Sequence, residues 1–176
     1  MEAPLKTEDA LPISSDALLE RLTAWELPFE LHEHPPLRTV EDAKSVEAAM
    51  TVPGEQALRI KNLYLRDKKK RNYLVTLEQD REIDLKALGA ALGVGNLSFG
   101  SADRLFEVLG VRPGAVTPLA MINGVEKGVR FFMDSAFHEV DRVYMHPLVN
   151  DRTIAMSRGD VMRFFEQIGV EPEWVE

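Results

Sequence analysis

The chain has 176 residues, of which 45% are hydrophobic and 28% charged, with no cysteine and a net charge of −8. This length and balance indicate one soluble globular domain, and the lack of cysteine excludes disulfides, thiolate–zinc sites and a cysteine nucleophile and fits a reducing cytoplasmic location. The acidic balance argues against broad nucleic-acid binding, and no apolar run approaches the roughly 20 residues that cross a membrane.

The N-terminal quarter is predicted to hold a tail, two helices and a short strand. Residues 1–13 contain prolines without periodicity, so they are expected to form a flexible tail before a domain that spans residues 14–176. Ser14 can cap a helix whose leucines recur at helical spacing up to Trp25. Alternation over 29–32 favours a strand. Thr39-Val40-Glu41-Asp42 resembles a capping box and opens a second helix to about Met50.

A β-hairpin with a basic tip follows. The apolar runs 58–65 and 73–77 flank the polar stretch Arg66–Arg71, as two strands flank a turn. Alternation along the first strand places Lys61 on one face with Leu63 and Leu65, and Asn62 on the other. An ammonium group in a largely buried strand costs several kcal/mol unless it is compensated. The pattern therefore marks Lys61 as a functional candidate. The tip is either a local nucleic-acid contact or a solvated turn.

The C-terminal half is predicted to alternate helices and short strands. Asp84 and Gly93 bound a helix over 85–92, and a second helix runs from Ser101 to a glycine at 110. Ser157 caps a final helix that ends before Gly169. Strands are expected near 119–122, 128–133, 142–146 and 153–156. Interleaved helices with frequent hairpins predict a mixed α+β fold rather than a doubly wound sheet.

The sequence lacks the common phosphate-binding and nucleophile motifs. There is no phosphate-binding glycine loop and no Gly-x-Ser-x-Gly elbow. His32 and His34 are spaced to share a metal, but no third ligand is evident, so no metal site is predicted. The loop Gly114–Pro118 either presents backbone N–H groups to a ligand or connects a helix to a strand. His146 either reaches into a pocket from a strand end or is a hydrogen-bonded structural residue.

Several of these segments occur together, in order, in one known family. They are the residues 34–36 (His-Pro-Pro) and 39–43, the Lys-Asn strand and its tip at 61–69, the Gly-x-x-x-Pro loop at 114–118, and His146-Pro147-Leu148 with Asn150 and Thr153. The chain thereby resembles the YbaK/ProX aminoacyl-tRNA deacylases, most closely their free-standing alanyl-tRNA(Pro) deacylases. The resemblance runs from about Ser14 to Pro172. One departure is Leu58-Arg59-Ile60, where relatives often carry a His-Thr pair before the lysine.

The resemblance implies a fold, a reaction and a set of site residues. It implies a largely antiparallel central sheet or partial barrel surrounded by helices. It implies an enzyme that hydrolyses alanine from mischarged tRNA(Pro) without a cofactor or metal, and prolyl-tRNA synthetase as a partner. The implied catalytic residues are Lys61, Gly114 and His146. The implied substrate-binding residues are Asn62, Ala115, Val116, Thr117, Pro118, Ile60, Val46, Met50 and Thr39. The implied tRNA-binding residues are Arg66, Lys68, Lys69, Lys70 and Arg71.

Two alternative functions stay open at this level. The chain could remove cysteine, serine or another small amino acid from its tRNA. It could also be a non-catalytic module that binds tRNA or a synthetase. The presence of both Lys61 and the Gly114–Pro118 loop favours the enzyme, because a binding module would not require both.

Overall fold

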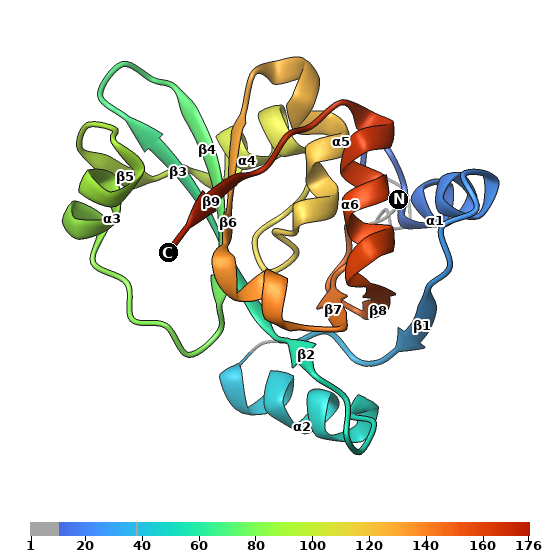
Figure 1. Cartoon of the computed structure of the whole chain (residues 1–176). Coiled ribbons are helices and arrows are strands. Elements are labelled where there is room, and N and C mark those ends of the chain that lie inside the picture. The colour runs from blue at the N-terminus through green and yellow to red at the C-terminus, as the bar shows by residue number, and fades with distance from the viewer. Residues whose placement is uncertain (1–10, 38) are drawn as a thin grey trace, which may run out of the picture.

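Two mixed sheets and six α-helices make up the part of the chain that the structure, a computed structural model, describes: residues 11–37 and 39–176 (Figure 1). The helices are α1 (Ser15–Ala24), α2 (Val40–Met50), α3 (Leu85–Leu92), α4 (Ala102–Leu109), α5 (Met121–Gly124) and α6 (Arg158–Ile168). The strands are β1 (Glu30–Glu33), β2 (Ala57–Leu58), β3 (Ile60–Asp67), β4 (Asn72–Glu78), β5 (Leu97–Phe99), β6 (Arg130–Asp134), β7 (Arg142–Met145), β8 (Arg152–Ser157) and β9 (Glu173–Val175). The predicted mixed single-domain fold is confirmed.

The two sheets meet where β2 passes into β3. The smaller sheet has the order β1-β8-β7-β2, in which β2 and β7 are parallel and the other pairs antiparallel. The larger has the order β5-β3-β4-β6-β9, in which β3 is antiparallel to both of its neighbours and β6 is parallel to both of its own. Only Arg59 separates β2 from β3, so the chain crosses from one sheet to the other within a single residue.

Local signals in the sequence explain most helix ends. The Thr39 hydroxyl accepts the Asp42 N–H while the Asp42 carboxylate accepts the Thr39 N–H, which is the predicted capping box of α2. Side chains likewise cap the predicted helices at Ser14, Asp84, Ser101 and Ser157. Glycines in the left-handed conformation end α3, α4 and α6.

The β3–β4 hairpin separates two hydrophobic clusters. The larger cluster includes Leu18, Leu22 and Phe164, all fully buried, and also takes in Tyr64 from β3. The smaller cluster packs Leu63 and Leu65, from the opposite face of β3, against α3. The predicted alternation along this strand is therefore confirmed.

Two sequence-based expectations need correction. The predicted strand at 119–122 is helical: a 3₁₀ turn over Pro118–Ala120 runs into α5, because Thr117 accepts the Leu119 N–H and proline occupies the first turn. Of the predicted tail, residues 1–10 lie outside the described residues, whereas Leu11 is buried in the larger cluster and Ile13 packs against it. The packed chain thus begins by residue 11. None of the described helices is long and apolar enough to cross a membrane.

Candidate functional site

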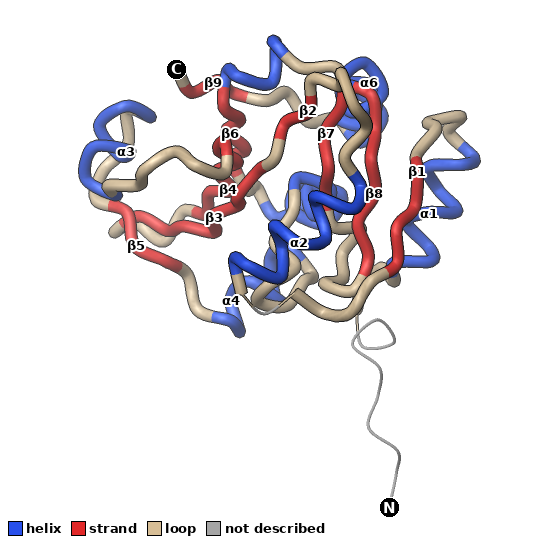
Figure 2. Tube along the Cα trace, turned by 90° about the horizontal axis from the view of Figure 1, so that it is seen from below, coloured by secondary structure: helices blue, strands red, loops and turns tan. Residues whose placement is uncertain are grey.

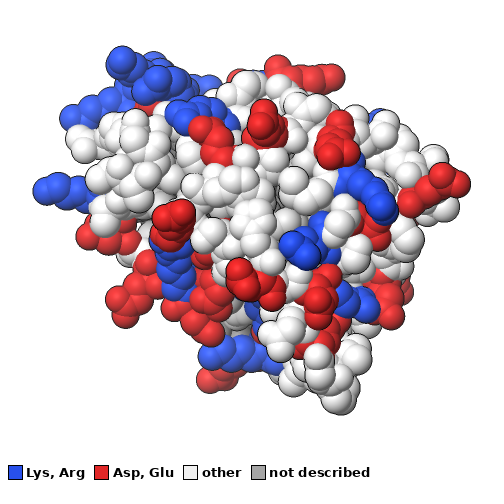
Figure 3. Space-filling view, viewed as in Figure 1, with Lys and Arg blue, Asp and Glu red and all other residues white. Residues whose placement is uncertain are grey.

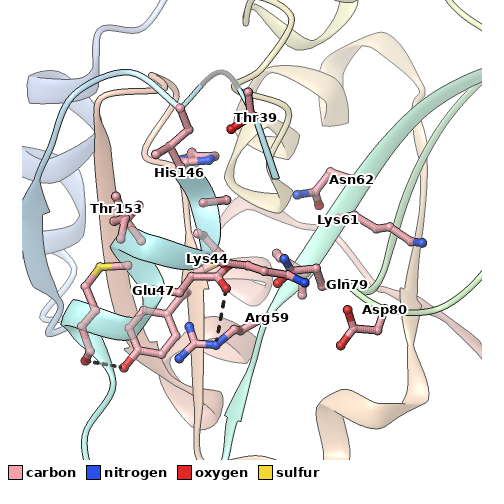
Figure 4. A pocket seen from close by; sticks show the side chains of 17 residues that line it. Thr39, Lys44, Glu47, Arg59, Lys61, Asn62, Gln79, Asp80, His146 and Thr153 are labelled. Atoms are coloured by element: carbon pink, nitrogen blue, oxygen red, sulfur yellow. Dashed lines mark hydrogen bonds and ion pairs between the residues drawn. The ribbon is translucent and has the colours of Figure 1, made fainter. Parts of the chain in front are cut away.

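A cavity of about 450 Å³ lies where the two sheets meet, beneath α2. Seen from below, α2 lies between β3 and the pair β7–β8 (Figure 2). The close-up in Figure 4 shows the side chains that line it. These residues, the cavity wall, are Leu37, Thr39, Ala43, Lys44, Val46, Glu47, Met50, Arg59, Ile60, Lys61, Asn62, Gln79, Asp80, Tyr144, Met145, His146 and Thr153. Seven residues proposed from the sequence are among them: Thr39, Val46, Met50, Ile60, Lys61, Asn62 and His146.

Lys61 stands at the edge of this cavity. Its Nζ donates a hydrogen bond to the backbone carbonyl of Arg81, which offsets part of the cost of removing the ammonium group from water. In Figure 4 the side chain points away from His146, toward the side of Asp80. The charge therefore lies beside the cavity rather than at its centre in this structure.

Asn62 projects from the opposite face of β3, into the cavity. Its Oδ1 accepts a hydrogen bond from the Thr76 hydroxyl at 2.6 Å. This bond fixes the amide orientation, so the NH₂ group points toward the cavity (Figure 4). Asn62 thereby offers donors to a carbonyl or hydroxyl oxygen of a ligand.

His146 closes β7 and is neutral at neutral pH. Its Nδ1 lies 2.9 Å from the carbonyl oxygen of Arg152, and because a carbonyl only accepts, Nδ1 carries the proton. Nε2 is then left as an acceptor. Burial lowers the pKa of His146 from its ordinary value, more than the Arg152 hydrogen bond raises it. The imidazole can therefore accept a proton through Nε2.

Thr153 is held by a histidine next to His146. The Nδ1 of His34 lies 2.8 Å from the Pro35 carbonyl and therefore donates, so its Nε2 accepts from the Thr153 hydroxyl at 2.8 Å. The His34 and His146 rings are 6.3 Å apart. The hydroxyl proton of Thr153 is thus committed to His34 rather than to the cavity.

The sequence analysis missed a charged group on the α2 side of the wall. Arg59 lies 3.7 Å from Glu47 and stacks over the Tyr144 ring at 5.1 Å, while the Tyr144 hydroxyl donates to Glu55 at 2.7 Å. Burial raises the pKa of Glu47, although the charge of Arg59 opposes this. The spacing 43, 46, 47, 50 puts Glu47 on the same helical face as Val46 and Met50, and this signal could have identified it.

The loop Gly114–Pro118 is not part of the cavity wall. Gly114 has a φ of +89°, and a Cβ there would lie 3.2 Å from Nδ2 of Asn150. That Nδ2 donates to the carbonyl of Leu37, a wall residue, at 2.7 Å. The loop therefore lies behind the rim, with Ala115, Thr117 and Pro118 buried. Direct contact of Gly114, Ala115, Val116, Thr117 or Pro118 with a substrate stays a prediction.

The basic tip, Arg66–Arg71, lies at the far end of β3 from the cavity. The blue cluster at the upper left of Figure 3 coincides with the β3–β4 turn in Figure 1. Six residues separate Lys61 from Asp67, or about 20 Å of strand. Arg71 is bound to Asp67 at 2.6 Å, whereas Lys68, Lys69 and Lys70 are exposed. The three lysines are therefore the part of the tip that is available to a partner.

Comparison with known proteins identifies the family and supports the fold. Residues 34–164 match the family model described as the aminoacyl-tRNA editing domain. The chain is 39% identical over 163 residues to the prolyl-tRNA synthetase associated domain-containing protein 1 of Mus musculus, covering 88% of this chain and 91% of that protein. It is 31% identical over 157 residues to the prolyl-tRNA editing protein ProX of Acetoanaerobium sticklandii, covering 89% and 93%.

A solved structure shares the fold. The crystal structure of a proposed trans-editing enzyme for prolyl tRNA synthetase superposes with a TM-score of 0.64 at 17% identity, covering 92% of this chain and 96% of that one. The match over residues 34–164 and the identity to an editing protein identify the chain as an editing hydrolase, an aminoacyl-tRNA deacylase, and the cavity at the sheet junction is its candidate active site. The chain belongs to the aminoacyl-tRNA editing domain family. The resemblance read from the sequence, and the class of enzyme it implied, are confirmed.

Proposed function

We propose that the chain hydrolyses mischarged alanyl-tRNA(Pro), releasing alanine and tRNA with a free 3′ end. The observation that carries this proposal is the composition of the cavity wall. Among its described residues there is no cysteine or serine, and both threonines are engaged: Thr39 caps α2, and Thr153 donates to His34. A wall that offers no serine or cysteine, and whose threonine hydroxyls both make hydrogen bonds, fits direct attack by water on an ester.

The wall residues supply the groups that such a reaction needs. Water adds to the ester carbonyl carbon, and the bond from that carbon to the ribose oxygen then breaks, so the ribose leaves as a hydroxyl after it gains a proton. Nε2 of neutral His146 can orient the water or take its proton. The vicinal ribose 2′-hydroxyl of the substrate can help to orient the water by a hydrogen bond, while the proton goes to Nε2 of His146. The amide NH₂ of Asn62 can hold the carbonyl oxygen.

Lys61 is proposed to supply positive charge at the ester or at the ribose and phosphate oxygens next to it. To do so its Nζ gives up the hydrogen bond to the Arg81 carbonyl, which is worth about 1.5–3 kcal/mol for a charged donor. A stronger charge-assisted bond to an anionic oxygen can offset that loss. This predicts that substrate draws the lysine side chain toward the cavity.

Amino-acid selection is proposed to depend on size. The side chains of Val46, Met50 and Ile60 line the cavity, and they can exclude a proline ring while accepting a methyl group. The converse selection is weak, since one methylene in an apolar pocket is worth about 1–3 kcal/mol. A synthetase for proline therefore gains from a separate enzyme that removes alanine, and prolyl-tRNA synthetase is the partner that we propose.

The test is release of labelled amino acid from Ala-, Cys-, Ser- and Pro-tRNA(Pro). Wild type is compared with Lys61→Ala and with Lys86→Ala, a control that removes an exposed lysine outside the wall. We expect rapid loss of alanine alone, abolished by Lys61→Ala and unchanged by Lys86→Ala. Faster release of cysteine or serine would move the substrate to that amino acid. Binding of tRNA without hydrolysis in any form would favour the non-catalytic module.

A further inference from the structure

Phe99 is an aromatic side chain in an unusually open position. It is 62% exposed, whereas the other exposed large hydrophobic residues of the described chain range from 37% to 47%. It ends β5, which is the edge strand of the larger sheet. Leu97, two residues earlier on the same strand, is buried in the smaller cluster. Leu97 is therefore part of the hydrophobic core, whereas the Phe99 ring is exposed to solvent.

The neighbours of Phe99 carry positive charge. In the β3–β5 ladder Phe99 pairs with Leu65, and Ser98 pairs with Arg66. The exposed lysines of the basic tip follow directly after the β3 segment to which β5 is paired. Phe99 lies opposite Leu65, three residues before Lys68, so about 10 Å of strand separates its ladder position from the first of these lysines.

The backbone at Phe99 is held in a fixed place. The Gly100 N–H donates to the Tyr64 carbonyl at 3.0 Å, and Gly100 sits so close to the Tyr64 ring that a side chain could not fit. The next residue, Ser101, caps α4 through its hydroxyl. The backbone at Phe99 is thus fixed by the β3–β5 ladder on one side and by the start of α4 on the other.

We propose that Phe99 and the lysines of the basic tip form a stacking platform for the single-stranded 3′ end of the tRNA. An aromatic face beside basic side chains is the combination that binds single-stranded nucleic acid, since the ring stacks on a base of any kind and the lysines neutralise phosphates. The role deepens the proposed function and rests on it.

The spacing along β3 fits this assignment. Leu65, the ladder partner of Phe99, is four residues from Lys61, or about 13 Å of strand. Stacked nucleotides rise about 3.4 Å each, so this length corresponds to about four of them. Leu65 lies on the face of β3 opposite Asn62, so with the esterified adenosine at the cavity the nucleotides behind it would reach Phe99 around β5, the edge strand of the sheet.

The test separates this role from catalysis. Deacylation of alanyl-tRNA(Pro) and of the small ester alanyl-adenosine is measured for wild type, Phe99→Ala, Phe99→Trp and Val52→Ala, the last removing a different exposed apolar side chain. Phe99→Ala should raise KM for the tRNA at least about fivefold, as loss of one stacked base predicts, with kcat unchanged. Phe99→Trp should restore it. Neither the small ester nor the Val52→Ala enzyme should show a change.

Binding of an uncharged acceptor-stem hairpin, with and without its 3′ single strand, decides the inference independently of hydrolysis. Phe99→Ala should weaken binding of the hairpin that has the single strand and leave the blunt one unaffected. Equal binding by wild type and Phe99→Ala would overturn the platform, as would an equal loss on alanyl-adenosine. Intact RNA binding with weaker binding to prolyl-tRNA synthetase would make Phe99 a protein contact. If no aminoacyl-tRNA is hydrolysed, the proposed function fails while the hairpin result still stands.

Discussion

Substituting Gly100 by alanine should destabilise the protein, because the added methyl group would overlap the ring of Tyr64. A Cβ on residue 100 would lie 2.1 Å from Cε2 and 2.4 Å from Cδ2 of Tyr64. Tyr64 is 5% exposed and its hydroxyl donates to Asn72 at 2.5 Å, so the ring has little room to move. The backbone is fixed as well, through the Gly100–Tyr64 hydrogen bond.

The size of the effect follows from the overlap. Overpacking in a tightly fitted site costs about 1–3 kcal/mol, and an overlap of more than 1 Å against a held ring places Gly100→Ala at about 2–3 kcal/mol. For a chain of this length that lowers Tm by about 4–12 °C. Urea denaturation followed by tryptophan fluorescence would measure the free energy of unfolding.

Gly159→Ala provides the matched control for this experiment. Gly159 lies in the first turn of α6, and a methyl group added there would have no other atom within 4 Å, so alanine should stabilise by up to about 0.5–1 kcal/mol. A loss below about 0.5 kcal/mol for Gly100→Ala, with Gly159→Ala behaving as expected, would refute the reasoning. It would show that Tyr64 and the backbone shift freely, and Phe99 would then not be fixed.

Three further predictions concern titration and salt. Burial lowers the pKa of His146 in the folded protein, so the unfolded chain binds a proton at higher pH than the folded one, and stability should fall as pH drops below about 6.5. His146→Gln should reduce this pH dependence, measured by urea denaturation at pH 5.5 and 7.5. Burial opposes ionisation of Asp67, but hydrogen bonds from Arg71 and Tyr73 lower its pKa to about 2. The stabilisation by this carboxylate is therefore present above about pH 4 and is lost toward pH 2. Asp67→Asn should lower the free energy of unfolding by about 1–3 kcal/mol at pH 7 and flatten the acid-unfolding curve. Replacing Lys68, Lys69 and Lys70 by glutamine should lower the slope of log KM for tRNA against log salt by about 2, measured from 50 to 200 mM salt.

Each of these three has an outcome that would contradict it. Equal pH dependence in wild type and His146→Gln would mean that the imidazole keeps its ordinary proton affinity. An Asp67→Asn protein as stable as wild type would show that the turn does not depend on the carboxylate. An unchanged salt slope in the lysine variant would remove the basic tip from tRNA binding.

Short-range chemistry is what the sequence predicted well. Helix starts at Ser14, Thr39 and Ser157 were predictable because a cap is decided within three residues. The faces of β3 were predictable because strand alternation is fixed by the backbone. The strand at 119–122 failed because a run of four apolar residues fits a buried helix equally well, and the Thr117-Pro118 start that decides the matter was not weighed.

Long-range contacts account for the features of the structure that the sequence did not predict. Nothing near Lys61 in the sequence indicates that its ammonium group binds the carbonyl of Arg81, twenty residues later. The separation of Gly114 from the cavity depends on Asn150 lying between the loop and Leu37, a contact across three distant segments. The three shortest strands, β2, β5 and β9, have two or three residues each, too few for a period to show.

The position of β3 between β4 and β5 has a consequence for substrate geometry. Hydrogen bonds to β4 run along β3 from Ile60 to Arg66, and β5 adds a second neighbour at Leu65–Asp67, so the distance from Lys61 to the ladder partner of Phe99 is fixed by the sheet. With Phe99 stacked on the 3′ end as proposed, this fixed distance sets the length of single strand that fits between the cavity and the stacking platform. A tRNA whose 3′ end is one nucleotide shorter would then lose one of the two contacts and should bind more weakly.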